Sequence, residues 1–233
     1  MTTLVKAPAA PALGIAMIAL AVGFNLPFAR LAAVFDYPDI LRRPAEEVLA
    51  AFVAGGPSLI LTWHAFALAA LLFLPVGMAH ALGLGRVAAQ PVLAIIAAVA
   101  AALAGLTQAM GLLRWVMVVP GLAATNDVAG FSLIHAYAGV ALGEHLGQLL
   151  TALYVGLVAV MQWREGRRVL VAIGGLATGA ITIGAFEGVA LAIGRDGAVF
   201  GLIAVAGYLL LTVWMIGSGV TMFSGRKTRV AAV

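Results

Sequence analysis

The sequence predicts an all-α, polytopic integral membrane protein with six transmembrane helices. Of its 233 residues, 64% are hydrophobic and 9% are charged, and the mean hydropathy is +1.13. A soluble domain is typically about 45–50% apolar and about 25% charged. Six apolar stretches are each long enough to cross a bilayer, and together they form one predicted domain over residues 1–233. The stretches are residues 12–35, 59–82, 91–119, 131–163, 169–193 and 199–223.

The basic residues of the short loops predict the orientation of these helices. With the N-terminus inside, eight Lys and Arg residues fall in cytoplasmic segments: Lys6, Arg86, Arg164, Arg167, Arg168, Arg226, Lys227 and Arg229. Three fall in outer loops: Arg42, Arg43 and Arg195. Because cytoplasmic loops carry the excess of Lys and Arg, we expect both termini to lie inside. The lipid bilayer is the first expected partner of the protein.

The first outer loop, residues 36–57, predicts a short amphipathic helix. Pro44 followed by Glu46 and Glu47 is typical of a helix start, and Gly55-Gly56-Pro57 of its end. One face is apolar: Val48, Leu49, Phe52 and Val53. Such a helix lies on the membrane surface or packs over the mouth of the bundle.

Residues 135–154, HAYAGVALGEHLGQLLTALY, place a carboxylate and an imidazole inside an apolar helix. A charge at the centre of a membrane helix costs roughly 2.5–3.5 kcal/mol, so Glu144 and His145 need partners. At 100° per residue, one polar stripe forms along this helix and should face the protein interior. Its members are Tyr137, Glu144, Gln148 and Thr151.

Polar residues of the other spans fall in the same outer layer. With the predicted topology and 1.5 Å of rise per residue, His64, Glu144, His145 and Glu187 lie roughly 9–10 Å outside the midplane. We therefore predict a ligand-binding polar pocket in the outer half of the bundle, formed by Glu144, His145, Glu187, His64, Arg114, Trp115, Arg30 and Gln148. The alternative is a buried network in which Arg114 or Arg30 neutralises Glu144 and Glu187. His80 lies apart, near the cytoplasmic end of its helix.

The same residues raise two cofactor hypotheses. His64, His145, Glu144 and Glu187 supply nitrogen and carboxylate donors suited to zinc or iron, although no HExxH or ExxH spacing is present. His64 and His145 also satisfy the equal depth that two axial ligands of a single b-type haem require.

Several classes of protein are excluded or left without support. The absence of cysteine excludes disulfides and thiolate chemistry, and no GxSxG, P-loop or GxGxxG pattern assigns a reaction. The scattered basic residues do not indicate nucleic acid. Trp63, Trp115, Trp163 and Trp214 are expected at the membrane interfaces.

The leading hypothesis for the function is a ligand- or ion-binding sensor, accessory subunit or small carrier. The alternatives are a haem- or metal-dependent redox protein and a structural subunit of a membrane complex or homo-oligomer.

Three segments carry a resemblance: YPDILRRPAEEVLAAF at 37–52, GLLRWVMVVPGLA at 111–123 and YAGVALGEHLGQLLTALY at 137–154. In these the chain resembles an uncharacterised bacterial family of polytopic membrane proteins, a family with a domain of unknown function. The resemblance implies a bacterial inner-membrane protein and brings no activity with it. Its motifs include Arg114, Trp115, Glu144 and His145.

Overall fold

The computed structural model describes residues 2–7, 9–224 and 226–231 and confirms an all-α membrane protein. Among these residues, six helical segments are long and apolar enough to cross a membrane. Three of the segments are single helices: α1 (Pro11–Phe35), α2 (Ala45–Leu82) and α10 (Ala198–Val220). The other three are composed of shorter elements. Pro91–Ala124 contains α4 (Pro91–Met117) and α5 (Val119–Ala124), Val128–Arg164 contains α6 (Val128–Ile134), η2 (His135–Leu146) and α7 (Gly147–Arg164), and Arg168–Ala192 contains α8 (Arg168–Gly184) and α9 (Glu187–Ala192).

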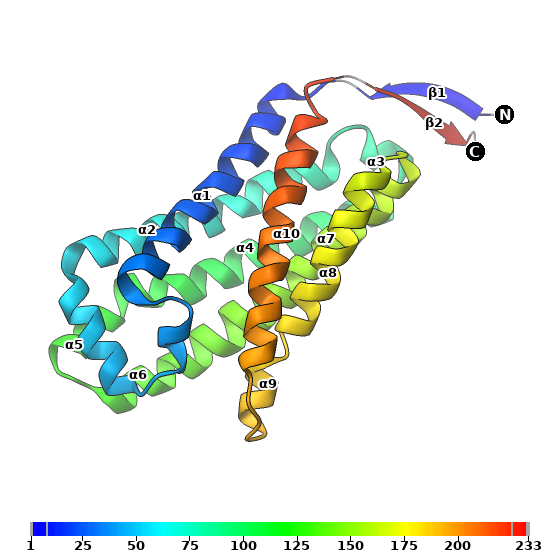
Figure 1. Ribbon diagram of the computed structural model, residues 1–233. Helices are drawn as coiled ribbons and strands as arrows, with labels where there is room; N and C mark the ends of the chain where they lie inside the picture. The colour runs from blue at the N-terminus through cyan, green and yellow to red at the C-terminus, as the bar shows by residue number, and fades with distance from the viewer. Residues whose placement is uncertain (1, 8, 225, 232–233) are drawn as a thin grey trace.

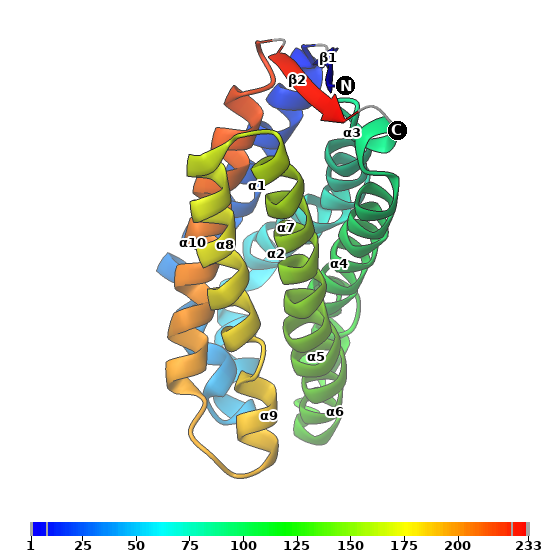
Figure 2. The ribbon, with the colours of Figure 1, turned by 90° about the vertical axis from the view of Figure 1, so that its right-hand side faces the viewer.

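The six spans form a closed ring in which each helix packs against the next along the chain. α2 packs on α4, α4 on α7, α7 on α8 and α8 on α10, and α10 closes the ring against α1. Figure 2 shows α10, α8, α7 and α4 side by side in this order. Small residues permit the close approach of α2 and α4, since a Cβ added at Gly105 would lie 2.8 Å from the carbonyl oxygen of Ala70.

Both ends of the chain lie at the same end of the bundle (Figure 1). There β1 (Thr2–Ala7) pairs antiparallel with β2 (Arg226–Ala231), with Thr2 opposite Ala231. This two-stranded ribbon lies outside the helical bundle, and the short helix α3 (Arg86–Ala89) lies at the same end. We call this the proximal end. The opposite, distal end carries α5, α6, α9 and the loop 36–44, and the predicted topology turns it outward.

The helix predicted in the first outer loop is present and continuous with α2. It begins at Ala45 and bends at Gly56, whose φ of 58° and ψ of −158° are not helical, just before Pro57. Val48, Leu49 and Phe52 are buried, and Phe52 stacks on Trp115 at 5.7 Å. These three residues thus pack over the end of the bundle, which is the second of the two predicted arrangements. Val53, the fourth residue of the predicted apolar face, is 59% exposed and does not join them.

The tryptophans correct one expectation. Trp63, Trp115 and Trp214 are fully buried, and only Trp163 among the four is exposed. Trp63 and Trp115 stack face to face with ring centroids 4.8 Å apart. They are the centre of a distal apolar cluster that also contains Phe35, Phe52 and Phe131. Three of the four therefore act as core residues, because a fold of many small residues needs large rings to fill its ends.

Candidate functional site

Two of the predicted site residues, Glu144 and Glu187, meet at the distal end across a single arginine. Arg42 Nη2 lies 2.7 Å from Glu144 Oε2, and Arg42 Nε lies 2.7 Å from Glu187 Oε1. The three side chains keep 29%, 23% and 13% of their surface exposed, respectively. We call Arg42, Glu144 and Glu187 the ion trio. Its arginine comes from the 3-10 turn η1 (Asp39–Arg42), outside the spans.

From the sequence, Arg42 indicates only the orientation of the helices. The alternative in which Arg114 or Arg30 neutralises the two glutamates is wrong, because both carboxylates pair with Arg42. The nearby Glu144 and Glu187 carboxylates offset the desolvation of Arg42 and raise the pKa of its guanidinium above the ordinary value. Arg42 therefore stays charged whenever the carboxylates are charged.

Glu144 lies on a π-helix, η2, which replaces the expected α-helix over twelve residues. A π-helix closes its hydrogen bonds from i to i+5 and so takes more residues per turn than an α-helix. Two positions seven residues apart, such as Tyr137 and Glu144, then no longer share a face. Tyr137 is 63% exposed, so the predicted stripe is wrong at that position. π-helical segments are rare and mostly single turns, and such turns frequently lie at functional sites.

Glycines of both α4 and η2 let these two elements approach each other closely. A Cβ added at Gly111 would lie 2.8 Å from Gly143 Cα and 2.9 Å from the carbonyl oxygen of Ala138. Both neighbours are backbone atoms, so a side chain at Gly111 would separate the two elements.

We expect Gly111→Ala to lower the free energy of unfolding by about 1–3 kcal/mol, the usual cost of overpacking. Gly121→Ala is the matched control, because no atom lies within 4 Å of a Cβ built there. Unfolding of both variants in detergent, followed by tryptophan fluorescence, measures the difference. Equal stabilities of the two variants would contradict the tight crossing of α4 and η2.

Arg114 is buried beneath the trio and does not pair with Glu144. It donates to the carbonyl of Gly111, and its Nη2 lies 3.3 Å from Nδ1 of His135. The guanidinium occupies the space over Gly139, where a Cβ would come 2.7 Å from Nη2. Its Nε has no hydrogen-bond partner among the described residues. Trp115, its neighbour, belongs to the distal apolar cluster.

Tyr37 brings a hydroxyl from the loop 36–44 into the field of the trio. Burial raises its pKa to about 12, and the Glu144 carboxylate adds to the shift. Its ring packs edge-on against Trp63 at 5.2 Å. The hydroxyl is therefore protonated at neutral pH and can donate a hydrogen bond beside Glu144. Nothing in the pattern of the spans indicated this residue, because it lies outside them.

His145 and Gln148 are placed around the trio without joining it. His145 Nδ1 lies 2.7 Å from the carbonyl oxygen of Ala185, which holds the bend between α8 and α9, two residues before Glu187. Gln148 is buried, and its Oε1 has no hydrogen-bond partner among the described residues. One turn further, Gln108 donates to Thr151 over 2.7 Å. These polar groups extend the site toward the middle of the ring.

The metal-site hypothesis finds no matching geometry. Within residues 9–224, no three His, Asp or Glu side chains converge as metal ligands. The two histidines of the haem hypothesis lie on different elements, His64 on α2 and His145 on η2, and both elements pack against α4. Arg30 also lies away from the trio, where its side chain contacts α2.

The proximal half of the ring holds a polar network that the sequence analysis missed. Arg86 is almost fully buried and binds Glu165 through two hydrogen bonds of 2.6 and 3.1 Å. It also donates to the carbonyl of His80, whose Nδ1 lies 2.6 Å from the Tyr154 hydroxyl. Arg86 and Glu165 lie in two loops that the predicted topology places at the same membrane face, and opposite charges at one face often pair; this was the signal that the sequence offered.

The chain was compared with protein-family models, with curated proteins and with solved structures, and it matches none of them.

Proposed function

We propose that this multi-pass membrane protein binds a small organic cation, a guanidinium or an amine, between Glu144 and Glu187. The observation that carries the proposal is that both carboxylates, from different segments of the chain, hold one guanidinium at 2.7 Å each. Two carboxylates at this spacing suit a planar cation with several donors. A free cation of the same chemistry can take the place of Arg42.

The position of Arg42 supports an exchange of this kind. It lies on the short turn η1 and not within a span, so its release requires only a movement of the loop 36–44. The partial exposure of all three side chains leaves a route from the outer solution. Tyr37 offers a neutral hydroxyl beside the carboxylates. In a bacterial inner membrane, where we place the protein, the site would face the periplasm and suit a sensor or a small carrier.

The test uses methylguanidinium chloride as the probe, with sodium chloride at equal ionic strength as the reference. Thermal unfolding of the detergent-purified protein is followed by tryptophan fluorescence. We expect stabilisation of the wild type, and stronger stabilisation of Arg42→Ala, in which the tethered competitor is gone. A probe at about ten times its Kd stabilises by about 1.4 kcal/mol. Arg42→Ala/Glu144→Gln/Glu187→Gln should not respond.

Two outcomes would refute the proposal. No response in either protein removes the binding site. In the second outcome, the probe stabilises Arg42→Ala but does not stabilise the wild type even at much higher concentration. The trio is then a structural ion pair, the role expected of a subunit of a membrane complex. Ethylammonium and tetramethylammonium chloride, used in the same way, distinguish a site for several donors from a site for any positive charge.

A further inference from the structure

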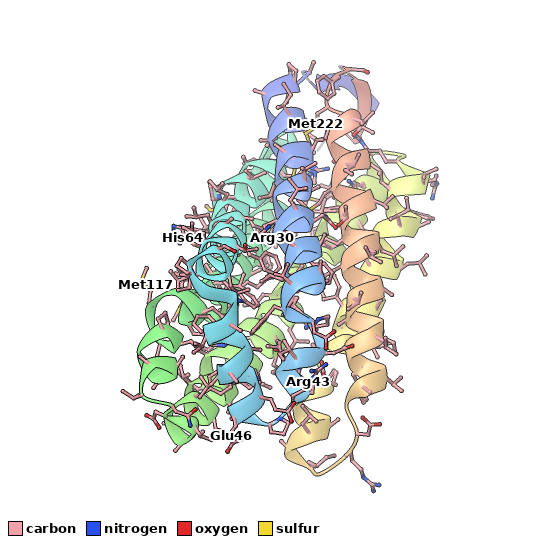
Figure 3. The ribbon with its side chains drawn as sticks, turned by 60° about the vertical axis from the view of Figure 1, so that its left-hand side comes forward. Arg30, Arg43, Glu46, His64, Met117 and Met222 are labelled. Atoms are coloured by element: carbon pink, nitrogen blue, oxygen red, sulfur yellow. The ribbon has the colours of Figure 1, made fainter. Side chains whose placement is uncertain are left out.

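Arg30 projects from α1 onto the outside of the ring, near the distal end of the span (Figure 3). It lies five residues before Phe35, so its Cα is roughly 7–8 Å below the end of the helix at 1.5 Å per residue. Arg30 Nε donates to the hydroxyl of Thr62, and Nη2 donates to the hydroxyl of Ser58, both over 3.0 Å. Both partners are neutral residues of α2.

Within residues 9–224, Arg30 forms no ion pair, unlike Glu144 and Glu187, which share Arg42. The span arginine Arg114 is also without an ion pair, but it is buried inside the bundle, whereas Arg30 is exposed on its outside. A guanidinium at membrane depth without a carboxylate is costly, and the nearest anions outside the protein are the phosphates of the lipids. Arginine has five N–H donors, and the two bonds to α2 leave three for a phosphate.

A groove of about 420 Å³ surrounds Arg30 between α1 and α2. Its polar wall consists of Arg30, Ser58 and Thr62, and its apolar wall of Leu26, Pro27, Leu61 and Ala65. α1 runs toward the distal end and α2, beyond its bend, runs away from it. Leu26 therefore lies deeper in the membrane than Arg30, and Leu61 and Ala65 deeper than Ser58. Thr62 lies slightly deeper than Leu61, and the deepest residues of the groove, Leu26 and Ala65, are apolar.

A phospholipid in the same leaflet has a matching arrangement, with its polar headgroup toward the surface and its acyl chains toward the midplane. We propose that the groove binds a membrane phospholipid, with its phosphate on Arg30 and Ser58 and one acyl chain between Leu26 and Leu61. The guanidinium can bind two phosphate oxygens at once, and the bonds to Thr62 and Ser58 hold it in place. The site does not depend on the ion trio, which lies inside the ring and contains none of these residues.

The experiment is native mass spectrometry of the purified protein with phosphatidylglycerol added in mixed micelles. We expect the wild type to retain one lipid more tightly than Arg30→Gln by about tenfold or more, since hydrogen bonds between a guanidinium and a phosphate are stronger than bonds between neutral groups. Arg195→Gln, an equal change of charge in an exposed distal loop, should retain the lipid as the wild type does. Arg30→Lys should retain it less well than the wild type, because lysine cannot form the two-pronged contact.

A second variant tests the apolar wall without touching the charge. Ala65→Phe fills the deep part of the groove and should also lose the lipid. Its thermal stability without added lipid reports that it is folded. Equal retention by the wild type, Arg30→Gln and Ala65→Phe would overturn the proposal. If inorganic phosphate alone displaces the lipid or stabilises the wild type to the same extent, the site takes a free anion, and the assignment to a phospholipid is wrong.

Discussion

Arg42→Ala is expected to lower the free energy of unfolding by about 2–3 kcal/mol. Removing one partner of a fully buried ion pair costs about 3–5 kcal/mol, because a charge is left in a medium of low polarity. The lower figure applies because the trio keeps 29%, 23% and 13% of its side-chain surface exposed. Two carboxylates lose their cation at once, so the effect exceeds that of a surface pair. Unfolding in mixed micelles with increasing dodecyl sulfate measures it.

The adjacent Arg43 supplies the matched control. It pairs with Asp36, and these side chains are 48% and 54% exposed. A pair of this kind contributes about 0–1 kcal/mol, so Arg43→Ala should have little effect. Adding Glu144→Gln and Glu187→Gln to Arg42→Ala should restore most of the lost stability, because the repulsion between the carboxylates is removed. Equal losses for Arg42→Ala and Arg43→Ala would show that the trio is no more than a surface contact.

Glu165→Gln is expected to cost about 3–4 kcal/mol, the largest loss among the variants considered. Arg86 has 1% of its side chain exposed and depends on both oxygens of Glu165. An amide cannot supply the negative charge that compensates a buried guanidinium. Glu165 also lies 3.2 Å from Arg167 Nε, so the same change weakens the connection of α7 to α8. The loss should appear in the unfolding measurement used for Arg42→Ala.

Glu46→Gln is the control for this second variant. Glu46 is exposed in the first turn of α2, where a negative charge contributes about 0.3–1 kcal/mol through the helix dipole. Replacing Arg86 and Glu165 together by methionine should recover much of the stability, since a well-packed apolar pair can match a buried ion pair. A Glu165→Gln protein as stable as Glu46→Gln would contradict the structural role of the proximal network.

The candidate site was only partly predictable from the sequence. Glu144 and Glu187 are identifiable because an ionisable side chain within an apolar, membrane-spanning segment costs free energy whatever the segment packs against. Their depth along the helices was also enough to predict that they share a layer. The sequence distance between Arg42 and these partners is 102 and 145 residues, and no local pattern relates positions so far apart. The π-helix η2 then changed which residues face inward, since the prediction assumed α-helical spacing.

The class of fold follows from local properties of the chain. Hydropathy, segment length and loop composition can each be read for one span at a time. A bilayer then requires each such span to be helical, because its backbone groups need internal hydrogen bonds. Which charge meets which depends on how the helices pack around the ring. Packing placed Trp63 and Trp115 in a core, left Arg30 exposed beside α2, and brought Arg42 from a loop onto two glutamates. These pairings are long-range contacts. Before the helices have packed, each of them has a free energy similar to that of many alternative pairings, so the sequence alone does not select among them.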